Sequence, residues 1–541
     1  MPLPPKAAVL GNAVAVLAST GLAGQARPRH LRASARALRT TGTSAATLLA
    51  LAAEHRPDAP GLVDDAGALT FAELDDLSSR LARGFAERRG PGRGATVAIM
   101  CRNHRYWVVA TIAAARLGAD VVYLNTEFSA PQLAGIWERL TPDLLVVDAE
   151  FLPVVPTGDD GAPTVPTVVG WTDGADLPVA TVDELAAEHE PHTPQGRVPP
   201  GKVTILTSGT TGAPRGAARK LSPMAVLSPA VTIIRRTRMR SGEPMMISVP
   251  LFHGFGLAMW ALALFVRCPV VLRRRFDPER ALADIAEHRV AFAAMVPVML
   301  QRLLALPEPV RRAHDRRTLR TVLSGGAALR PELAERFMAE FGDVLYNGYG
   351  SSETGIAAVA TPADLRAAAG TVGKPSIGTP VRILDDNRAP VPTGRSGAIF
   401  VGGHSHFEGG GEHAKELVDG LMDTGDLGRL DAEGRLHVEG RADDMIVSGG
   451  ENVYPQEVED CLARHPAVAD VAVLGVADEE YGQRLRAFVV LRSPTTPEEL
   501  IAHVKANLAR YKVPREVRVL DELPRNPTGK LLKRELPGAG S

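Results

Sequence analysis

The chain has 541 residues, of which 45% are hydrophobic and 23% are charged, an ordinary balance for a folded globular protein. Its 61 basic and 62 acidic residues leave a formal net charge of −1, which argues against nonspecific binding to nucleic-acid phosphates. The three cysteines, Cys101, Cys268 and Cys461, are too far apart for a CxxC pair or a disulfide framework. We therefore expect an enzyme of a reducing compartment, the cytoplasm.

Residues 1–45 form an apolar and basic N-terminal extension. The segment Ala7–Ala26 has no charged residue, and five arginines follow it between Arg27 and Arg39. Since the uncharged segment is mostly Ala and Gly, its transfer into a bilayer is only weakly favourable. We expect a helical extension packed on the main body; a signal peptide and peripheral contact with an anionic membrane are the alternatives.

Between residues 46 and 440, helical patterns such as Ala72–Glu87 alternate with short apolar runs. Apolar runs bounded by Gly, Pro or Asp predict buried and mostly parallel strands. These runs are Ala95–Met100, Leu144–Val147, Val203–Leu206, Val270–Leu272 and Val322–Ser324. Residues 152–200, rich in Pro, Thr, Gly and Asp, predict a surface excursion.

From about Thr379 the pattern changes to hairpin-like β segments, for example Val381–Leu384 and Ala398–Val401. A boundary near residues 440–444 sets off a smaller unit, residues 441–541. Its predicted strands are Val471–Val476, Ala487–Leu491 and Glu516–Val519, and its predicted helices are Gln456–Arg464 and Pro497–Ala509. The fold class is therefore α/β, with a large domain over residues 46–440 and a small α+β domain over residues 441–541.

The strongest local motif directly follows the apolar run Val203–Leu206. It consists of Thr207, Ser208, Gly209, Thr210, Thr211 and Gly212, with the cation of Arg215 three residues later. Glycine backbone N–H groups and hydroxyls in such a loop can bind phosphate oxygens. The loop is not a Walker A motif, because the chain has no G-x-x-x-x-G-K-[ST].

Five further segments are weak signals when taken singly. Gly326 and Ala327 follow an apolar run where a backbone can approach a flat base, and Tyr349 offers an aromatic face near the carboxylate of Glu353, a ligand that Mg²⁺ accepts. Asp426 ends an Asp-Thr-Gly-Asp turn and can bind ribose hydroxyls. The remaining segments are Gly440–Asn452 and Asn526–Lys530.

In their order and spacing, these motifs resemble the adenylate-forming superfamily, which includes acyl-CoA synthetases, aryl-CoA ligases, firefly luciferase and the adenylation domains of nonribosomal peptide synthetases. The resemblance covers about residues 45–535. It implies a large N-terminal domain of α/β subdomains plus a β-barrel, joined by a hinge to a small mobile C-terminal domain. It also implies that ATP and CoA are cosubstrates and that Mg²⁺ is the metal cofactor.

The resemblance assigns roles in forming an acyl-adenylate from a carboxylic acid and ATP. Lys530 would bridge the substrate carboxylate and the α-phosphate, Glu353 would hold Mg²⁺, and Arg441 would lie beside the ribose-binding Asp426. The remaining nucleotide contacts would come from Thr207–Gly212, Arg215, Gly326, Ala327, Tyr349, Gly350 and Ser352. Arg215 and Ser352 stand where the family often has Lys and Thr, so charge and hydroxyl are kept but the geometry changes.

For thioester formation, the resemblance implies that the small domain rotates about Asp443 and presents Gly449 and Gly450 to the thiol arm of CoA. Glycines there leave a narrow passage open, because no side chain blocks it. Arg275 matches a position near the CoA phosphates, although an exposed basic turn is an equally good interpretation. An acyl carrier protein is the alternative acceptor.

The acyl pocket would be framed by Phe252, His253, Gly348 and Gly350. The segment around His253 has no carboxylate to pair with an ammonium group, which disfavours amino acids as substrates. Acetate-specific relatives have Trp at the position of Gly350, so glycine there suggests a longer acyl chain. We expect a medium- to long-chain fatty acid, with aryl acids next and a non-catalytic acyl or nucleotide sensor as the remaining alternative.

The histidines His404, His406 and His413 are interpreted as exposed loop residues rather than metal ligands.

Overall fold

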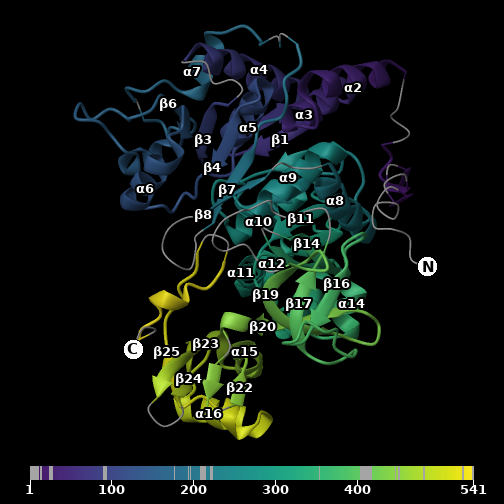
Figure 1. Ribbon diagram of the computed structural model, residues 1–541, viewed down its shortest axis with the longest axis vertical. Coiled ribbons are helices and arrows are strands. Elements are labelled where there is room, and N and C mark those ends of the chain that lie inside the picture. The colour runs from purple at the N-terminus through teal and green to yellow at the C-terminus, as the bar shows by residue number, and fades with distance from the viewer. Residues whose placement is uncertain are drawn as a thin grey trace. The chain divides into compact units, whose positions relative to one another are not determined.

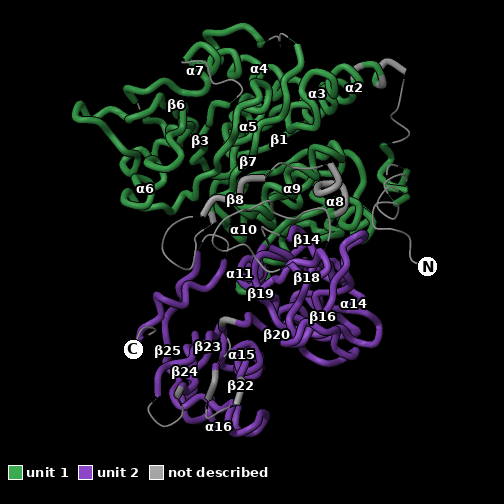
Figure 2. The backbone as a smooth tube through the Cα atoms, viewed as in Figure 1, with its two compact units in different colours: residues 1–295, 305–322, 404–412 green, residues 296–304, 323–403, 413–541 purple. Residues whose placement is uncertain are grey.

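The structure is a computed structural model. It describes residues 11–12, 15–16, 18–22, 28–88, 94–175, 177–192, 194, 196–207, 215–219, 223–351, 354–402, 417–444, 446–448, 451–478, 482–526 and 529–538. The chain divides into two compact units, the first comprising residues 1–295, 305–322 and 404–412, and the second residues 296–304, 323–403 and 413–541 (Figure 2). The domain boundary expected near residue 440 lies inside the second unit.

A six-stranded sheet forms one layer of the first unit (Figure 1). Its strand order is β6 (Thr167–Val169), β5 (Leu144–Val147), β3 (Thr96–Met100), β4 (Asp120–Tyr123), β7 (Val203–Thr207) and β8 (Arg215–Arg219). All neighbours are parallel except β8, which is antiparallel to β7. The prediction that residues 152–200 are a surface excursion is wrong for β6, because Val168 and Val169 are fully buried beside β5.

A second group of strands in the first unit runs in the order β2 (Gly67–Thr70), β1 (Pro60–Asp64), β10 (Val270–Val271), β9 (Met245–Ile247) and β11 (Phe292–Met295). Helices of this unit include α3 (Ala45–His55), α4 (Phe71–Glu87), α5 (Arg105–Leu117), α6 (Ala130–Leu140), α7 (Val182–Ala187), α8 (Pro223–Thr237), α9 (Gly254–Val266) and α10 (Pro278–Glu287). Helix α4 begins where it does because Thr70 and Glu73 form a reciprocal capping box.

The N-terminal extension contains helix α2 (Pro28–Thr41), which packs on α3. The imidazole rings of His30 and His55 lie 4.0 Å apart, and the hydroxyls of Thr41 and Thr47 are 2.6 Å apart. The expected packing of a helical extension on the body is confirmed for this part. Among the described residues, no helix has the length and apolarity needed to cross a bilayer.

In the second unit, the segment of the chain for which the resemblance implies a barrel forms antiparallel strands. Their order is β13 (Leu345–Ser351), β14 (Gly355–Ala360), β15 (Thr371–Pro375), β20 (Leu436–Arg441), β19 (Leu421–Leu430), β17 (Gly397–Val401) and β16 (Val381–Leu384). The predicted segments Val381–Leu384 and Ala398–Val401 are therefore confirmed as strands. Helices α11 (Pro297–Ala305), α13 (Pro331–Phe341) and α14 (Pro362–Ala367) belong to the same unit, except for the last residue of α11.

A separate five-stranded sheet follows β20. Strands β22 (Glu451–Val453), β21 (Ile446–Ser448), β24 (Gly482–Leu491) and β23 (Val468–Asp478) pair in that order, and β25 (Glu516–Val519) lies parallel to β24. Helices α15 (Pro455–Ala463) and α16 (Pro497–Asn507) cover a core that includes Leu462, Val473, Val489 and Leu500. The predicted strands and helices of the small domain are thus confirmed, as is the α/β fold class.

Candidate active site

Three predicted nucleotide-site residues converge in the second unit. The Tyr349 phenol donates a 2.5 Å hydrogen bond to Oδ2 of Asp426, and Arg441 Nη1 lies 3.7 Å from Oδ1 of the same carboxylate. Strands β19 and β20 pair Asp426 directly with Arg441. Burial and the neighbouring Asp426 raise the pKa of Tyr349, so its hydroxyl stays a donor. The Asp426 backbone N–H in turn donates to Thr424 Oγ1 at 3.1 Å, which restrains the backbone that carries the carboxylate.

The glycine loop after β12 (Thr321–Ser324) has the backbone form that the sequence suggests. Gly326 has a backbone φ of +80°, a value that residues other than glycine rarely adopt. The hydroxyl of Ser324 is buried and has no hydrogen-bond partner among the described residues. An orphaned buried polar atom beside an open glycine loop fits a polar ligand such as a purine base.

The loop that carries Lys530 and the glycine loop both pack against the side chain of Val296. A Cβ atom added at Gly326 would be 3.6 Å from Val296 Cγ1, and one added at Gly529 would be 3.3 Å from Val296 Cγ2. Gly529 also approaches Val298 so closely that its Cβ would lie 2.9 Å from Cγ1. The side chain of Lys530 is exposed, and no ion pair is formed by it with the described residues. Val296 thus brings the lysine loop to the predicted base-binding loop.

Several predicted site residues lie outside the described residues: Ser208–Gly212, Ser352, Glu353, Gly449 and Gly450, together with His404, His406 and His413. The backbone of Thr207 ends β7 and that of Arg215 begins β8, so the two strands flank the predicted phosphate loop as an antiparallel pair. Asp443 lies in the 3₁₀ turn Ala442–Asp444, between β20 and β21.

The predicted acyl-pocket residues of the first unit stand at the start of helix α9. The ring of Phe252 lies 4.6 Å from that of His253, which precedes the first helical residue. Burial lowers the pKa of His253 to about 4, so the imidazole is neutral at physiological pH. Its Nε2 atom is buried and has no hydrogen-bond partner among the described residues. This nitrogen can therefore bond a polar atom of a ligand.

Gly348 and Gly350 differ in what the fold demands of them. A Cβ at Gly348 would meet only Ser324 O at 3.5 Å and Leu323 Cδ1 at 3.6 Å, which are ordinary contacts. A Cβ at Gly350 would lie 1.9 Å from the carbonyl oxygen of Gly355 on the neighbouring strand. The close approach of β13 and β14 is a sufficient reason for glycine at position 350, so this glycine does not by itself measure the acyl pocket.

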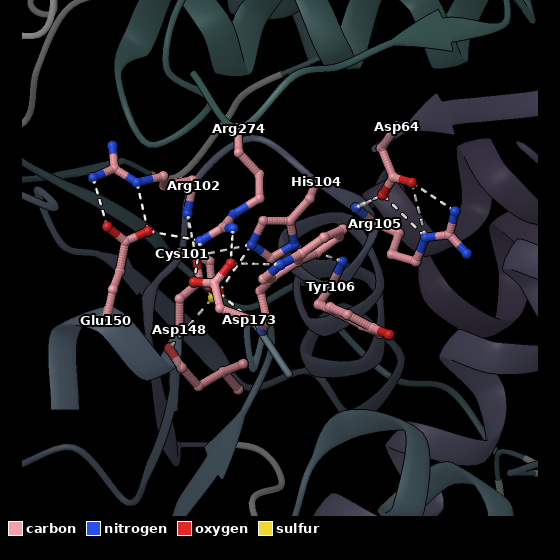
Figure 3. Close-up of polar contacts among 12 residues, drawn as sticks. Asp64, Cys101, Arg102, His104, Arg105, Tyr106, Asp148, Glu150, Asp173 and Arg274 are labelled. Atoms are coloured by element: carbon pink, nitrogen blue, oxygen red, sulfur yellow. Dashed lines mark hydrogen bonds and ion pairs between the residues drawn. The ribbon is translucent and has the colours of Figure 1, made fainter. Parts of the chain in front are cut away.

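The predicted CoA residue Arg275 belongs to an ion-pair cluster centred on Glu150. Figure 3 shows Glu150 with two further members of this cluster, Arg102 and Arg274. Arg102, Arg274 and Arg275 approach its carboxylate at 2.7, 2.8 and 3.0 Å. The Arg102 guanidinium is the main cause that lowers the pKa of Glu150 to about 2. The guanidinium of Arg274 also stacks over Trp171, at 4.9 Å from the ring centre. Only the Arg275 side chain, 73% exposed, extends from the cluster into solvent.

Next to this cluster, a buried carboxylate joins the ends of three strands. Asp148, which follows β5, accepts hydrogen bonds from the backbone N–H groups of Arg102 and Trp171 and from Nε2 of His104 (Figure 3). His104 Nδ1 accepts from the backbone N–H of Tyr106, so both ring nitrogens are satisfied. Cys101, His104 and Asp148 are close enough together to resemble a metal site, but their hydrogen bonds identify a structural network.

The α/β fold with a large N-terminal domain and a smaller C-terminal domain matches that of solved adenylate-forming enzymes. The chain belongs to the AMP-binding enzyme family, whose model matches residues 49–409, and the model of the AMP-binding enzyme C-terminal domain matches residues 457–530. It is an AMP-forming acid–thiol ligase, an enzyme class that uses ATP, Mg²⁺ and CoA.

Three similar proteins represent the family. The chain is 34% identical to a feruloyl-CoA synthase of Amycolatopsis sp over 90% of its own length and 96% of the relative. It is 30% identical to a fatty acid–[acyl-carrier-protein] ligase, ScoC, of Streptomyces coeruleorubidus, over 90% and 94% of the two chains. A solved structure of o-succinylbenzoate CoA synthetase from Bacillus subtilis, in complex with its acyl-adenylate, has a TM-score of 0.76 at 31% identity and covers 90% and 97%.

Proposed function

We propose that this enzyme activates an aryl or arylalkyl carboxylic acid with ATP and transfers the acyl group to CoA, releasing AMP and pyrophosphate. The observation that carries the proposal is the convergence of the Lys530 loop and the Gly326 loop on Val296, within the unit that also holds Asp426 and Tyr349. A carboxylate that attacks a triphosphate brings two anions together, so a free cation beside the nucleotide is the group this reaction needs.

In the first half-reaction, the Lys530 ammonium would hold the substrate carboxylate against the α-phosphate. Asp426 would accept the ribose hydroxyls, held in place by Tyr349 and Arg441. Thr207–Gly212 and Arg215 would bind the β- and γ-phosphates, and Gly326, Ala327, Gly350 and Ser352 would line the rest of the nucleotide. Glu353 would hold Mg²⁺, which neutralises phosphate charge when bound.

The second half-reaction passes the acyl group from the adenylate to the CoA thiol and releases AMP. We assign Gly449 and Gly450 to the passage for the thiol arm, Asp443 to the hinge, and the exposed guanidinium of Arg275 to the CoA phosphates. The domain division proposed for this step is residues 46–440 and 441–541. It is supported by the position of Asp443 between β20 and the separate five-stranded sheet.

An aryl acid is favoured over an alkyl acid by the surroundings of His253. A neutral imidazole with an unpartnered buried Nε2 beside the Phe252 ring offers one hydrogen bond and one aromatic contact. The feruloyl and o-succinylbenzoate groups named for two relatives are both aromatic and both carry polar substituents. A medium- to long-chain fatty acid is the second candidate substrate, favoured by the similarity to the fatty acid–[acyl-carrier-protein] ligase. The same similarity supports an acyl carrier protein as the alternative acceptor of the acyl group.

If the substrate is a fatty acid, residues 1–45 would make peripheral contact with a membrane. This contact is supported by the exposed side chains of Arg36 and Arg39 on helix α2 and by the absence of any acidic residue before Glu54. Basic helix faces of this kind bind anionic lipid headgroups.

The test is a substrate panel with ATP and Mg²⁺, run with and without CoA and read by mass spectrometry. The acids are ferulate, indoleacetate, 2-succinylbenzoate, benzoate, acetate, octanoate and palmitate. We expect acyl-CoA and AMP with the aryl acids only when CoA is present, and loss of both products in Lys530→Ala but not in the control Lys512→Ala. Turnover of octanoate or palmitate alone would select the second candidate, and acyl-AMP that accumulates regardless of CoA would select a carrier protein as acceptor.

A further inference from the structure

A single carboxylate links the predicted base-binding loop to the catalytic-lysine loop. Arg330 follows Ala327 by three residues and directly precedes helix α13, and its Nη1 lies 3.0 Å from Oδ1 of Asp470 on β23. The other oxygen of Asp470 lies 2.7 Å from Nη2 of Arg525. Arg330 Nη2 also donates to the carbonyl of Val471. Asp470 is therefore shared by two arginines from distant parts of the sequence.

The second arginine continues the link to the lysine. Arg525 Nη1 donates to the carbonyl oxygen of Gly529 at 2.8 Å, one residue before Lys530. Within the same turn, Lys530 N–H donates to Asn526 Oδ1 at 2.8 Å, and Asn526 N–H donates to Lys530 O at 2.9 Å. These bonds tie the Lys530 backbone to Asn526 and, through Gly529, to Arg525, so a shift of Arg525 would move the point from which the lysine side chain starts.

The linked groups are largely withdrawn from water, which makes their geometry specific. The side chains of Arg330, Asp470 and Arg525 are 13%, 15% and 22% exposed. Ion pairs at this depth are costly to break, because removing one partner leaves the other charges buried and unpaired. Loss of the Asp470 charge would leave two guanidinium groups facing each other.

We propose that Asp470 is a positioning residue for adenylate formation, acting with Arg330 and Arg525 to hold Lys530 at the base-binding loop. The inference rests on the role of Lys530 in the proposed function. A positioned cation loses most of its effect when it is displaced by about an ångström, at a cost of roughly a hundredfold in rate. Asp470 itself touches neither substrate nor reacting atoms in this assignment.

The first experiment compares the two half-reactions in Asp470→Asn, using the acid of the panel with the highest turnover. Adenylate formation is measured by ATP–pyrophosphate exchange, and thioester formation is measured from synthetic acyl-adenylate and CoA. We expect a loss of about 10- to 100-fold in exchange, mainly in kcat, and a change of less than about threefold in thioester formation. Hydrogen exchange at the amides of Asn526 and Lys530 should accelerate, while the amides of β23 and β24 stay protected.

The matched control is Arg464→Gln. Arg464 pairs with Glu332 at 3.0 Å and so also connects the small domain to helix α13, but it makes no bond to the described residues of the lysine loop. Its pyrophosphate exchange should stay within about threefold of the unmodified enzyme. An equal loss in Arg464→Gln and Asp470→Asn would show that general docking matters rather than the position of Lys530, and would overturn the proposal.

A double-mutant cycle separates this inference from the proposed function. If Asp470 acts through Lys530, the Asp470→Asn change should have no further effect in a Lys530→Ala background. Multiplying losses, or an unchanged exchange rate in Asp470→Asn alone, would refute the positioning role. Undiminished exchange in Lys530→Ala would refute the role of the lysine itself, and with it the proposed adenylation site.

Discussion

The Tyr349 phenol and the Asp426 carboxylate are joined by a 2.5 Å hydrogen bond that connects β13 to β19. Because the phenol is the donor, one oxygen of Asp426 is held in place while the other faces Arg441 at 3.7 Å. The two residues therefore have separable tasks. In the proposed adenylation site, Asp426 would bind the ribose hydroxyls, and Tyr349 would orient the carboxylate and present an aromatic ring to the nucleotide.

Substitution of Asp426 should thus weaken nucleotide binding much more than removal of the Tyr349 hydroxyl. We expect Asp426→Asn to lower AMP affinity about 10- to 100-fold, since a hydrogen bond to a charged group is worth about 1.5–3 kcal/mol. Tyr349→Phe keeps the ring and should cost less than about fivefold. Isothermal titration calorimetry with AMP measures both, and AMP affinity in Asp426→Asn equal to that of the unmodified enzyme would exclude Asp426 as the ribose ligand.

The buried carboxylate of Asp148 should dominate the stability of the first unit. Asp148→Ala leaves the N–H groups of Arg102 and Trp171 and the ring of His104 without their acceptor, so we expect a loss of about 3–5 kcal/mol. Asp160→Ala, which removes one exposed turn acceptor of the same unit, should cost less than about 1 kcal/mol. Denaturant unfolding gives both values. Added EDTA should leave the melting temperature unchanged; a fall would restore the metal interpretation of Cys101, His104 and Asp148.

Two acidic residues of the second unit should change stability with pH in opposite directions. Burial raises the pKa of Asp460 to about 6, so this carboxyl destabilises the fold increasingly as pH rises from about 4 to 6. Hydrogen bonds from Arg435 and His437 lower the pKa of Asp431 to about 2 despite its burial, so its stabilising contribution is present above about pH 4 and lost as pH falls toward 2.

The matched substitutions follow from these signs. At pH 7.5, Asp460→Asn should raise the free energy of unfolding by about 1–3 kcal/mol, and Asp431→Asn should lower it by about 1–2 kcal/mol. The gain in Asp460→Asn should shrink steadily between pH 6 and pH 4. Urea unfolding across this range is the measurement, and a gain that does not depend on pH would show that the carboxyl is not the cause.

Several motifs of the proposed nucleotide site were predictable because the local sequence is distinctive where a strand ends: Thr207 ends β7, Gly326 follows β12, and Arg441 ends β20. Asp426 and Arg441 also become neighbours through a short connection between β19 and β20, which a hairpin pattern indicates. The contact between Tyr349 and Asp426 is different, since 77 residues separate them and only the strand order brings them together.

The charged link through Asp470 carries no sequence signal at all. Arg330 lies 140 residues before Asp470 and Arg525 lies 55 residues after it, and each looks like an ordinary surface charge in its own segment. The acid specificity was also beyond the sequence. Gly350 indicates space for a long alkyl chain only if nothing else requires glycine at this position. A Cβ atom added at Gly350 would lie 1.9 Å from the carbonyl oxygen of Gly355, so backbone packing alone requires a glycine there.

The two glycines of strand β13 provide the test of that distinction. Gly350→Ala would force a Cβ onto the Gly355 carbonyl, and overpacking against a backbone atom should cost at least about 2 kcal/mol. Gly348→Ala meets only ordinary contacts and should leave the free energy of unfolding within about 1 kcal/mol of the unmodified value.

If Gly348 lines the acyl pocket, the added methyl should lower kcat/KM for bulky aryl acids about tenfold or more relative to acetate. Unfolding curves and the same acid panel are the measurements. Unchanged selectivity in a stable Gly348→Ala enzyme would show that Gly348 does not line the pocket. A Gly350→Ala enzyme as stable as the unmodified one would contradict the packing argument, and Gly350 would again indicate the depth of the pocket.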